Sequence, residues 1–514
     1  MKSNLVKWLS VIGAVAVSAA SAQETNEVEQ LKREMREMRE QMRRMEQKLE
    51  TIEQKPPVAA VGPAEKPVAV APPVEPSASS VTKPWSPSDP IRVGKGGTYA
   101  EIGLVGTFAA GGSTANDIQG GTQLGGHDPN QNGFTVQGVE MNLQGAVDPY
   151  FRANANILFS IDAGGESFLE VEEAWMETVS LPWNLQLRAG EILTDFGRIN
   201  TQHPHSWGFV DSPLVGARLL GPDGLRNPGA RLAWLAPTPF YTELSVGIQD
   251  SQGEHASSFR NSDANHGELG TDALPPDNAG LPYGYRNAVN DRGVNGLGDL
   301  LITPRLTTSF ELTDSQTLVL GGSAALGPNS SGSSGDTMTQ VYGLDIYWKW
   351  KPANAHGGFP FVSFQTEPMV MRYQLGAYDW DLNGNGAADP GELVNPATGL
   401  PAVLSRETVT DWGFYSQVLY GFTKNWVAGL RGDYVTGSLG NYEQLALTLD
   451  GNPVGRDQLR RERWRLSPNL TWYPSEFSKI RLQYNYDNRA DLGIDHSVWL
   501  QFEFLLGAHA AHKF

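Results

Sequence analysis

Apolar and polar side chains alternate along the last segment of the chain, residues 494–514. Even positions from Leu500 to Ala510 are apolar, whereas Gln501 and Glu503 fall on the other parity. This period of two predicts a strand with one apolar and one polar face. Because an exposed apolar edge strand invites aggregation, we expect this strand to close a membrane barrel by pairing with the first one. An edge strand of a soluble β-sandwich is the alternative interpretation.

The same alternation past Gly94 predicts sixteen strands, and an even number is typical of bacterial outer-membrane barrels. The expected strands are residues 99–108, 134–146, 150–161, 168–180, 185–193, 228–236, 240–249, 300–312, 316–326, 339–351, 359–374, 408–421, 425–437, 461–473, 478–488 and 494–514. The predicted fold class is therefore all-β, a sixteen-stranded antiparallel transmembrane β-barrel over residues 92–514. A barrel of this size is too wide for side chains to fill, so an open lumen is expected.

The lengths of the connections support this prediction. Short turns follow even-numbered strands, whereas the connections after odd-numbered strands include long loops rich in Gly, Asn and Asp. These long loops are residues 109–133, 194–227, 250–299, 375–407 and 438–460. Bacterial barrels have short periplasmic turns and longer extracellular loops, which predicts the orientation of the chain.

The amino-acid composition limits the classes of function that the chain can have. Charged residues are only 19% of the 514, with 57 glycines and 10% aromatic residues, which suits a β-protein. The absence of cysteine removes disulfides and thiol catalysis together, and the net charge of -18 argues against a nucleic-acid partner. No serine, histidine and acid set emerges that strand parity would gather in one place, so we expect no enzyme.

Three segments precede the predicted barrel. Residues 1–22 are expected to be a signal peptide, with two lysines ahead of a short apolar run and an Ala-Ser-Ala cleavage site. Within residues 23–54, apolar residues are spaced alternately by three and four, which predicts a periplasmic coiled coil of two, three or four strands. A lone amphipathic helix is the alternative. The Pro- and Ala-rich residues 55–91 are expected to form an extended linker.

Strand parity also predicts which charged residues face the lumen. The expected pore-lining residues are Arg152, Arg188, Arg231, Arg305, Lys349, Arg372, Arg431, Arg461, Arg463, Arg465 and Arg481. Inward acids are expected at Glu140, Asp345, Asp411, Asp433 and Glu503. This balance predicts a basic wall that favours anions, while the alternative is that arginine and acid ladders only stiffen the wall.

The loop at residues 194–227 contains more apolar residues than a solvated loop needs, so we expect it to fold into the pore and constrict it. Its candidate functional residues are Arg198, His203, His205, Asp211 and Arg218. The two histidines lie two residues apart across a proline, a spacing that could suit a metal ion. Without a third ligand nearby in the sequence, a packed or hydrogen-bonded role is favoured.

The segment DLNGNGAADPGE, residues 381–392, matches the twelve-residue calcium loop at every ligand position. The predicted Ca²⁺ ligands are Asp381, Asn383, Asn385, the carbonyl of Ala387, Asp389 through water, and Glu392. Its flanks are not clearly helical, so a structural brace on a long extracellular loop is the expected role. An Asn- and Gly-rich turn without a metal is the alternative.

The segment from Leu187 to Gly197, LRAGEILTDFG, resembles the strand-to-loop segment of the phosphate-selective porin family. That family usually has Gln in place of Glu191 and Pro in place of Asp195, and the terminal aromatic residue is also similar to that of outer-membrane proteins. The resemblance implies a homotrimer of sixteen-stranded barrels with an arginine-lined pore. No segment matches the family's phosphate-binding lysine cluster, so the resemblance does not extend to phosphate as the solute.

Three functions remain as hypotheses. The first is a passive outer-membrane channel for small, anionic solutes. The second is a metal-linked uptake protein, because the tail LQFEFLLGAHAAHKF resembles receptors described as zinc-regulated and TonB-dependent, which implies metal-related roles for His509 and His512. The third is a structural spacer, in which coil and linker hold the outer membrane at a set distance from the peptidoglycan.

Overall fold

The computed structural model describes residues 91–507, except residues 96–97, 147, 163, 254, 261–280, 287–293 and 334. The predicted signal peptide, the coiled coil and all but the last residue of the linker lie outside the described residues. The same is true of residues 508–514, which include both tail histidines.

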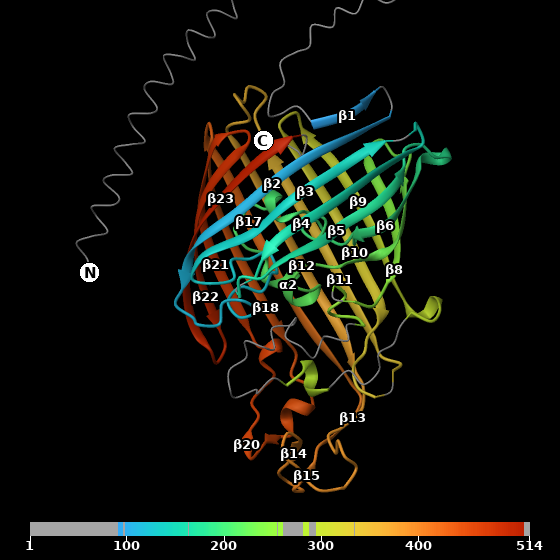
Figure 1. The fold of residues 1–514 in the computed structure, drawn as a ribbon, viewed down its shortest axis with the longest axis vertical. Coiled ribbons are helices and arrows are strands. Elements are labelled where there is room, and N and C mark those ends of the chain that lie inside the picture. The colour runs from blue at the N-terminus through green and yellow to red at the C-terminus, as the bar shows by residue number, and fades with distance from the viewer. Residues whose placement is uncertain are drawn as a thin grey trace, which may run out of the picture. The chain divides into compact units, whose positions relative to one another are not determined.

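Sixteen antiparallel strands form one closed barrel, as the alternation predicts (Figure 1). They are β2 (Thr98–Ser113), β3 (Gly133–Ala146), β4 (Phe151–Ile161), β5 (Ser167–Thr178), β6 (Leu185–Leu193), β7 (Arg226–Leu235), β8 (Tyr241–Asp250), β9 (Leu300–Thr313), β10 (Gln316–Pro328), β11 (Met338–Trp350), β12 (Phe361–Leu375), β17 (Glu407–Thr423), β18 (Trp426–Gly437), β21 (Arg463–Ser475), β22 (Ser478–Arg489) and β23 (Gly493–Gly507). β2 pairs with β23 from Gly103↔Gly507 to Ser113↔Ser497, which closes the barrel. A short strand β1 (Ile91–Lys95) adds a hairpin to the start of β2.

The two ends of the barrel differ as the connection lengths predict. In Figure 1 short turns lie at the end where β1 begins and β23 finishes, and long loops extend from the other end. The long loops carry small sheets made of β13 (Tyr378–Asp379), β14 (Leu393–Asn395), β15 (Leu400–Pro401), β16 (Val403–Leu404), β19 (Thr448–Leu449) and β20 (Asn452–Pro453).

Within the described residues, helices are few and short. They are α2 (Leu214–Leu219) and the 3-10 turns η1 (Pro182–Asn184), η2 (Pro204–Ser206), η5 (Tyr283–Tyr285), η6 (Leu297–Asp299), η7 (Tyr442–Gln444) and η8 (Gln458–Arg460). Among the residues that the structure describes, no helix is long and apolar enough to cross a membrane.

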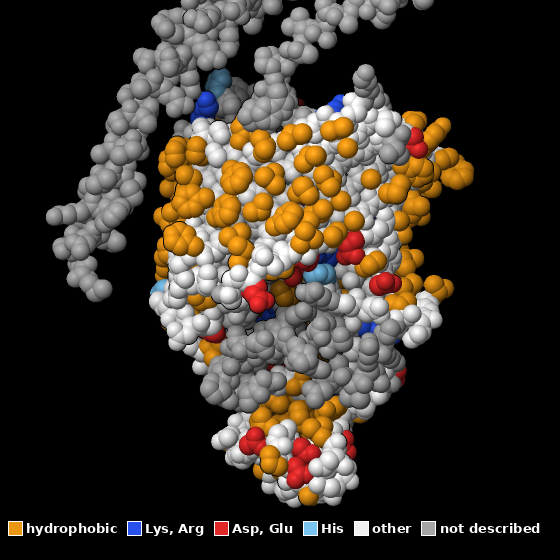
Figure 2. Space-filling view, viewed as in Figure 1, with side chains coloured by type: hydrophobic (Ala, Val, Ile, Leu, Met, Phe, Trp, Pro, Cys, Tyr) orange, Lys and Arg blue, Asp and Glu red, His pale blue; other side chains and the backbone are white. Residues whose placement is uncertain are grey.

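The outer face of the barrel carries an apolar band (Figure 2). Alternate residues of the strands point outward and stay exposed, for example Leu344 at 61%, Val498 at 48% and Phe502 at 40%. Large apolar side chains exposed around a closed sheet have no favourable contact with water, and a lipid bilayer is the solvent that suits them.

Loop side chains fill part of the barrel interior. Loop residues pack against the inward face of β9 to β18 in one apolar cluster, and α2 lies against β12, β17 and β18. The cluster includes Phe196, Leu214, Leu219, Phe259, Tyr283 and Trp380 from the loops, and Leu301, Val341, Met369, Met371 and Tyr415 from the strands. The open lumen predicted from the number of strands is therefore not found along β9 to β18. Apolar side chains from the long loops fill the space that the wall side chains leave there.

Candidate functional site

The loop between β6 and β7 folds into the barrel, as its apolar content predicts. Its first turn is fixed by Asp195, whose carboxylate accepts hydrogen bonds from Arg231 Nε at 2.8 Å and Ser245 Oγ at 2.6 Å. Arg305 Nε lies 3.4 Å from the other oxygen of Asp195. Asp195, one of the two positions at which this chain departs from the phosphate-selective porin pattern, thus joins the start of the loop to the wall.

Glu367 of β12 holds two residues a little further along the loop. Its carboxylate accepts the backbone N–H groups of Arg198 and Ile199, each at 2.9 Å, and the hydroxyl of Tyr415. The guanidinium of Arg198 lies 4.0 Å above the ring of Tyr347. This arrangement leaves the Arg198 side chain half-buried on the inner wall rather than packed inside the loop.

Replacing Glu367 by alanine should lower the thermal unfolding midpoint of the barrel. Two backbone N–H groups and one hydroxyl would lose a buried acceptor, at a cost of about 1–3 kcal/mol for each group left unsatisfied. Circular dichroism of the detergent-solubilised protein measures the midpoint. Glu311→Ala, which changes an exposed glutamate near the end of β9, is the matched control. Equal midpoints for the two variants would show that Glu367 does not hold the loop.

Asp211 is the deepest anchor of the loop, with no exposed surface. One oxygen accepts hydrogen bonds from Arg431 Nη2 at 2.7 Å and Gln483 Nε2 at 2.8 Å. The other accepts from Arg465 Nη1 at 2.9 Å and Asn485 Nδ2 at 2.8 Å. Four wall side chains from β18, β21 and β22 therefore converge on one loop carboxylate.

The charges around Asp211 keep it ionised. Burial alone would raise the pKa of this carboxyl, but Arg431 and Arg465 outweigh burial and hold the pKa below its ordinary value. The anchor therefore contributes stability above an ordinary carboxyl pKa of about 4 and loses it as the pH falls through the lowered native pKa.

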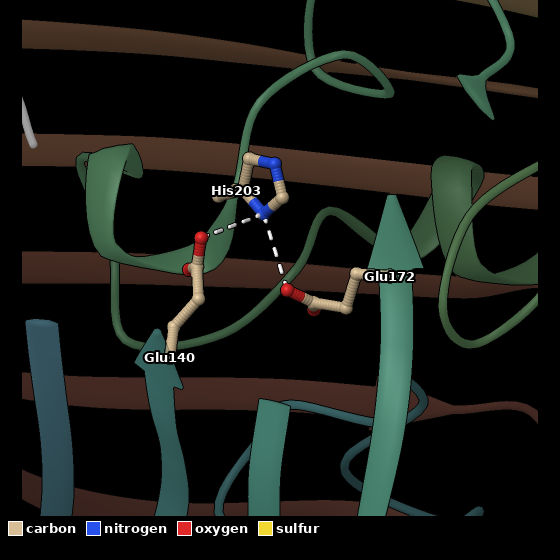
Figure 3. Close-up of side chains that lie close together, drawn as sticks. All are labelled: Glu140, Glu172 and His203. Carbon is tan, nitrogen blue, oxygen red and sulfur yellow. Dashed lines mark ion pairs between the residues drawn. The ribbon is translucent and has the colours of Figure 1, made fainter. Parts of the chain in front are cut away.

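A second charged cluster joins the loop to β3 and β5. The side chain of His203 points between two glutamates of the wall (Figure 3). Its Nδ1 lies 3.5 Å from Glu140 Oε1 and 3.3 Å from Glu172 Oε2, and the three ligand-type atoms lie within 4.8 Å of one another. Its other ring nitrogen, Nε2, lies 3.0 Å from Glu173 Oε2.

Two further histidines flank this cluster. His205 Nδ1 lies 3.0 Å from the second oxygen of Glu140, and His127 Nε2 lies 3.2 Å from the second oxygen of Glu172. The rings of His203 and His205 stack with their centroids 5.8 Å apart. Burial alone would lower the pKa of His203, but the charge of Glu140 and the adjacent carboxylates of Glu172 and Glu173 raise it well above the ordinary histidine value.

Two wall glutamates of this cluster, Glu172 and Glu173, face inward together because of a β-bulge that the alternation does not reveal. Asn156 of β4 pairs with Glu173, whereas the next residue of β4 pairs with Val171, so Glu172 is the extra residue. A bulge of this kind turns two consecutive side chains to one face of a sheet. Both glutamates are buried inside the barrel as a result. The signal for this bulge in the sequence is the pair of adjacent acids, which interrupts a strand whose outward-facing residues are apolar.

Most of the predicted wall arginines lie inside the barrel next to carboxylates. The ion pairs are Arg152 and Arg188 with Glu177, Arg231 with Asp195 and Glu243, Arg305 with Asp345, Arg431 with Asp433, and Arg463 and Arg465 with Asp487. Arg481 instead donates to Gln501 Oε1 and to the backbone carbonyls of Phe209 and Trp207 in the loop. Arg218 donates to the carbonyl of Arg461, and its Nη2 lies 3.6 Å from Asp411.

Two predicted lumen positions are wrong. Arg372 is exposed on the outward face of β12, because its odd-numbered neighbours Met369, Met371 and Tyr373 are the ones buried under the loops. Near Arg372 the strand carries apolar residues on both faces, so parity alone is ambiguous there. Arg461 precedes β21 and forms an ion pair with Asp491, which places it in the loop region rather than in an arginine ladder.

A different set of cations lies beside the start of the loop. Lys349 of β11 stands 5.5 Å above the ring of Phe361, and its charge interacts with those of Lys351 and Arg198. Within the described part of the chain, neither Lys349 nor Arg198 has a carboxylate at ion-pairing distance. β11 is eight strands from β3 in this sixteen-stranded barrel, so these cations lie across the lumen from the wall that carries Glu140.

The predicted calcium loop is folded around its acidic residues. Asp381 accepts the backbone N–H groups of Asn385 and Gly386, at 3.0 and 2.9 Å, and Glu392 accepts those of Leu382 and Asp389, at 2.9 and 3.1 Å. The amides of Asn383 and Asn385 both donate to Asp389 at 2.7 Å. They would have to rotate before their oxygens could face a cation.

No family model matches the chain. Among solved structures, the outer-membrane channel DcaP of Acinetobacter baumannii has a TM-score of 0.46 at 12% identity, over 79% of this chain and 97% of that one. OmpF of Salmonella typhi in complex with daunomycin has a TM-score of 0.43 at 10% identity, over 81% and 100% of the two chains.

Sequence comparison gives a nearer relative. A protein of Aquifex aeolicus strain VF5, described only as uncharacterized, is 30% identical over 407 residues, which cover 76% of this chain and 73% of that protein. The present chain therefore belongs to the same family as this Aquifex aeolicus protein.

Proposed function

We propose that the chain is an outer-membrane channel through which small solutes diffuse passively, with residues 194–227 as its constriction. The observation that carries the proposal is the inward loop, which buried ion pairs hold against the wall of a closed, outwardly apolar barrel. A loop that served only as an external connection would have no reason to place Asp211 against two buried arginines.

The proposal includes a preference for anions, which rests on Arg198 and Lys349. Because the wall arginines next to carboxylates are neutralised locally, they contribute little net field to a passing ion. Arg198 and Lys349 lack an ion-paired carboxylate among the described residues, so a permeating anion is attracted to that part of the wall.

Assembly is a further part of the proposal. The heptad spacing in residues 23–54 favours self-association through a periplasmic coil, and the resemblance to the phosphate-selective porins implies that three chains associate. Cross-linking of the intact protein and of a variant lacking residues 24–54 tests this. A trimer that persists without the coil would assign assembly to the barrels. The spacer hypothesis predicts that the deletion alters envelope spacing and leaves conductance unchanged.

We also propose that residues 381–392 bind Ca²⁺ as a structural brace. The support is the match of the side chains to the ligand positions of a calcium loop and the inward turn of Asp381 and Glu392. Adding Ca²⁺ should raise the thermal unfolding midpoint of the wild-type protein, because a ligand that binds only the folded state stabilises it. Glu392→Gln should abolish this shift and the exposed Glu462→Gln should keep it. A shift of equal size in both variants would refute the site.

Flux into liposomes tests the channel itself. Vesicles that contain the purified protein should swell in isotonic solutions of small solutes, faster for anions than for cations of similar size. Empty vesicles and vesicles with heat-denatured protein are the controls. Swelling at the rate of empty vesicles would contradict the proposed function and favour the metal-linked or spacer hypothesis.

A further inference from the structure

Three potential metal ligands face one another where the inward loop meets the wall. His203 Nδ1 contributes an imidazole nitrogen, and Glu140 Oε1 and Glu172 Oε2 contribute carboxylate oxygens from two different strands (Figure 3). The nitrogen-to-oxygen separations are 3.5 and 3.3 Å. A tetrahedral zinc ion with bonds of about 2.0–2.1 Å has ligand atoms about 3.3 Å apart, so these two separations match the edges of such a site.

The surrounding groups hold each ligand in the orientation that coordination needs. The nitrogen of His203 that faces away from the site lies 3.0 Å from Glu173 Oε2, which is the carboxylate–histidine arrangement that fixes a ligating imidazole. The outer oxygens of Glu140 and Glu172 are held by His205 and His127, at 3.0 and 3.2 Å. Each of the three ligands therefore has its own supporting partner.

Burial shows that the cluster is more than a set of surface acids. Glu172 is 4% exposed, and within the described structure its Oε2 accepts no hydrogen bond of good geometry, although it lies 3.3 Å from His203 Nδ1. A cavity of about 50 Å³ adjoins the cluster and is lined by His127, Glu172 and His203 among others. That volume exceeds the roughly 10–15 Å³ that one water needs, so a fourth ligand has room.

We propose that Glu140, Glu172 and His203 form a binding site for one divalent transition-metal ion, with a fourth coordination position open to the cavity. Imidazole and carboxylate ligands suit zinc and its neighbours in the first transition row, and the chain has no cysteine for a thiolate site. A cation of charge +2 would neutralise the two buried ligand carboxylates. The bound ion would join β3, β5 and the inward loop at one point. This site does not depend on the proposed channel function.

Zinc binding to the purified, untagged full chain tests the proposal, by competition with a chromophoric chelator. All proteins in the test should carry His509→Ala and His512→Ala, so that the tail histidines do not contribute. One zinc ion should bind tightly, and Glu172→Gln and His203→Ala should each abolish that binding. His205→Ala should weaken it by about 10–100-fold, as expected for a residue that only orients a ligand. His496→Ala changes a histidine that bonds to Tyr484 outside the cluster and should leave it unchanged.

Tight zinc binding that survives both Glu172→Gln and His203→Ala would overturn the site, and so would the absence of tight binding in the parent protein. If the ligand variants fail to fold, zinc-soaked crystals of the parent protein decide the question. An anomalous peak within coordination distance of His203 Nδ1 and both glutamates supports the proposal. A zinc ion bound only elsewhere, or no peak, refutes it.

Discussion

Replacing Asp211 by alanine should release the constriction loop and increase single-channel conductance severalfold. Arg431 and Arg465 would keep buried charges without their shared carboxylate, and Gln483 and Asn485 would lose an acceptor. Removing one partner from a buried ion pair typically costs about 3–5 kcal/mol. The barrel strands do not depend on this carboxylate for their own pairing, so we expect the loop to yield before the barrel does. Conductance in planar bilayers measures the effect.

Two further experiments make this expectation specific. Asp223→Ala changes another carboxylate of the same loop that lies outside the anchor, and its conductance should stay near the wild-type value. Wild-type protein should show the same increase reversibly at a pH well below the ordinary carboxyl pKa of about 4, because the anchor is lost only as the pH falls through the lowered pKa of Asp211. Unchanged conductance of a correctly folded Asp211→Ala barrel would show that the loop does not constrict the path.

The double variant Arg198→Glu, Lys349→Glu should reverse the ion preference of the channel. Both side chains are cations on the inner wall without an ion-paired carboxylate among the described residues, so they dominate the field that a passing ion meets there. The reversal potential under a KCl gradient should change sign, and the change should shrink as ionic strength rises and screens the charges.

The control is the double variant Lys424→Glu, Lys351→Glu, which changes the net charge by the same amount. It alters cations at the rim of the barrel and so separates effects of the rim from effects of the lumen. Lys424 lies in the turn between β17 and β18, and Lys351 follows the end of β11. We expect a smaller shift of the reversal potential from this pair. Equal shifts of the reversal potential from both double variants would show that the mouth of the barrel sets the selectivity. No shift from either double variant would contradict the proposed anion preference.

The fold followed from the sequence because each lipid-facing strand must alternate. Strand β6, Leu185–Leu193, lies at the predicted residues, and the pairing of Gly103 with Gly507 closes the barrel that the last strand predicts. The inward fold of residues 194–227 was predictable for a similar reason, since its apolar residues need a packed environment. The coiled coil and the linker lie outside the described residues and stay predictions.

Site details were harder to predict because they depend on departures from regular alternation. The bulge at Glu172 turns two adjacent glutamates inward, and without it the sequence offers no third ligand near His203 and His205. Arg372 was misplaced because the part of β12 near it is apolar on both faces, one toward lipid and one toward the loop. The partners of Arg463 and Arg465 are acids from β22 and the loop, and only the register and the path of the loop bring them together.

Because carboxylates neutralise these arginines, the proposed anion selectivity rests on other residues. Arg463 lies beside Asp487 and donates to the carbonyls of Gly121 and Thr122, so its charge serves to hold a loop. Reversing it would disturb packing as well as charge. Arg198 and Lys349 are the better positions for a test, since their neighbours are aromatic rings rather than carboxylates.

The most direct test of the constricted channel is the reversal potential of the purified wild-type protein in a planar bilayer under a KCl gradient. Discrete conductance steps with a chloride-selective potential are the predicted result, and phosphate or a dicarboxylate should reduce the current. A protein that is folded and inserted but passes no ions would contradict the account.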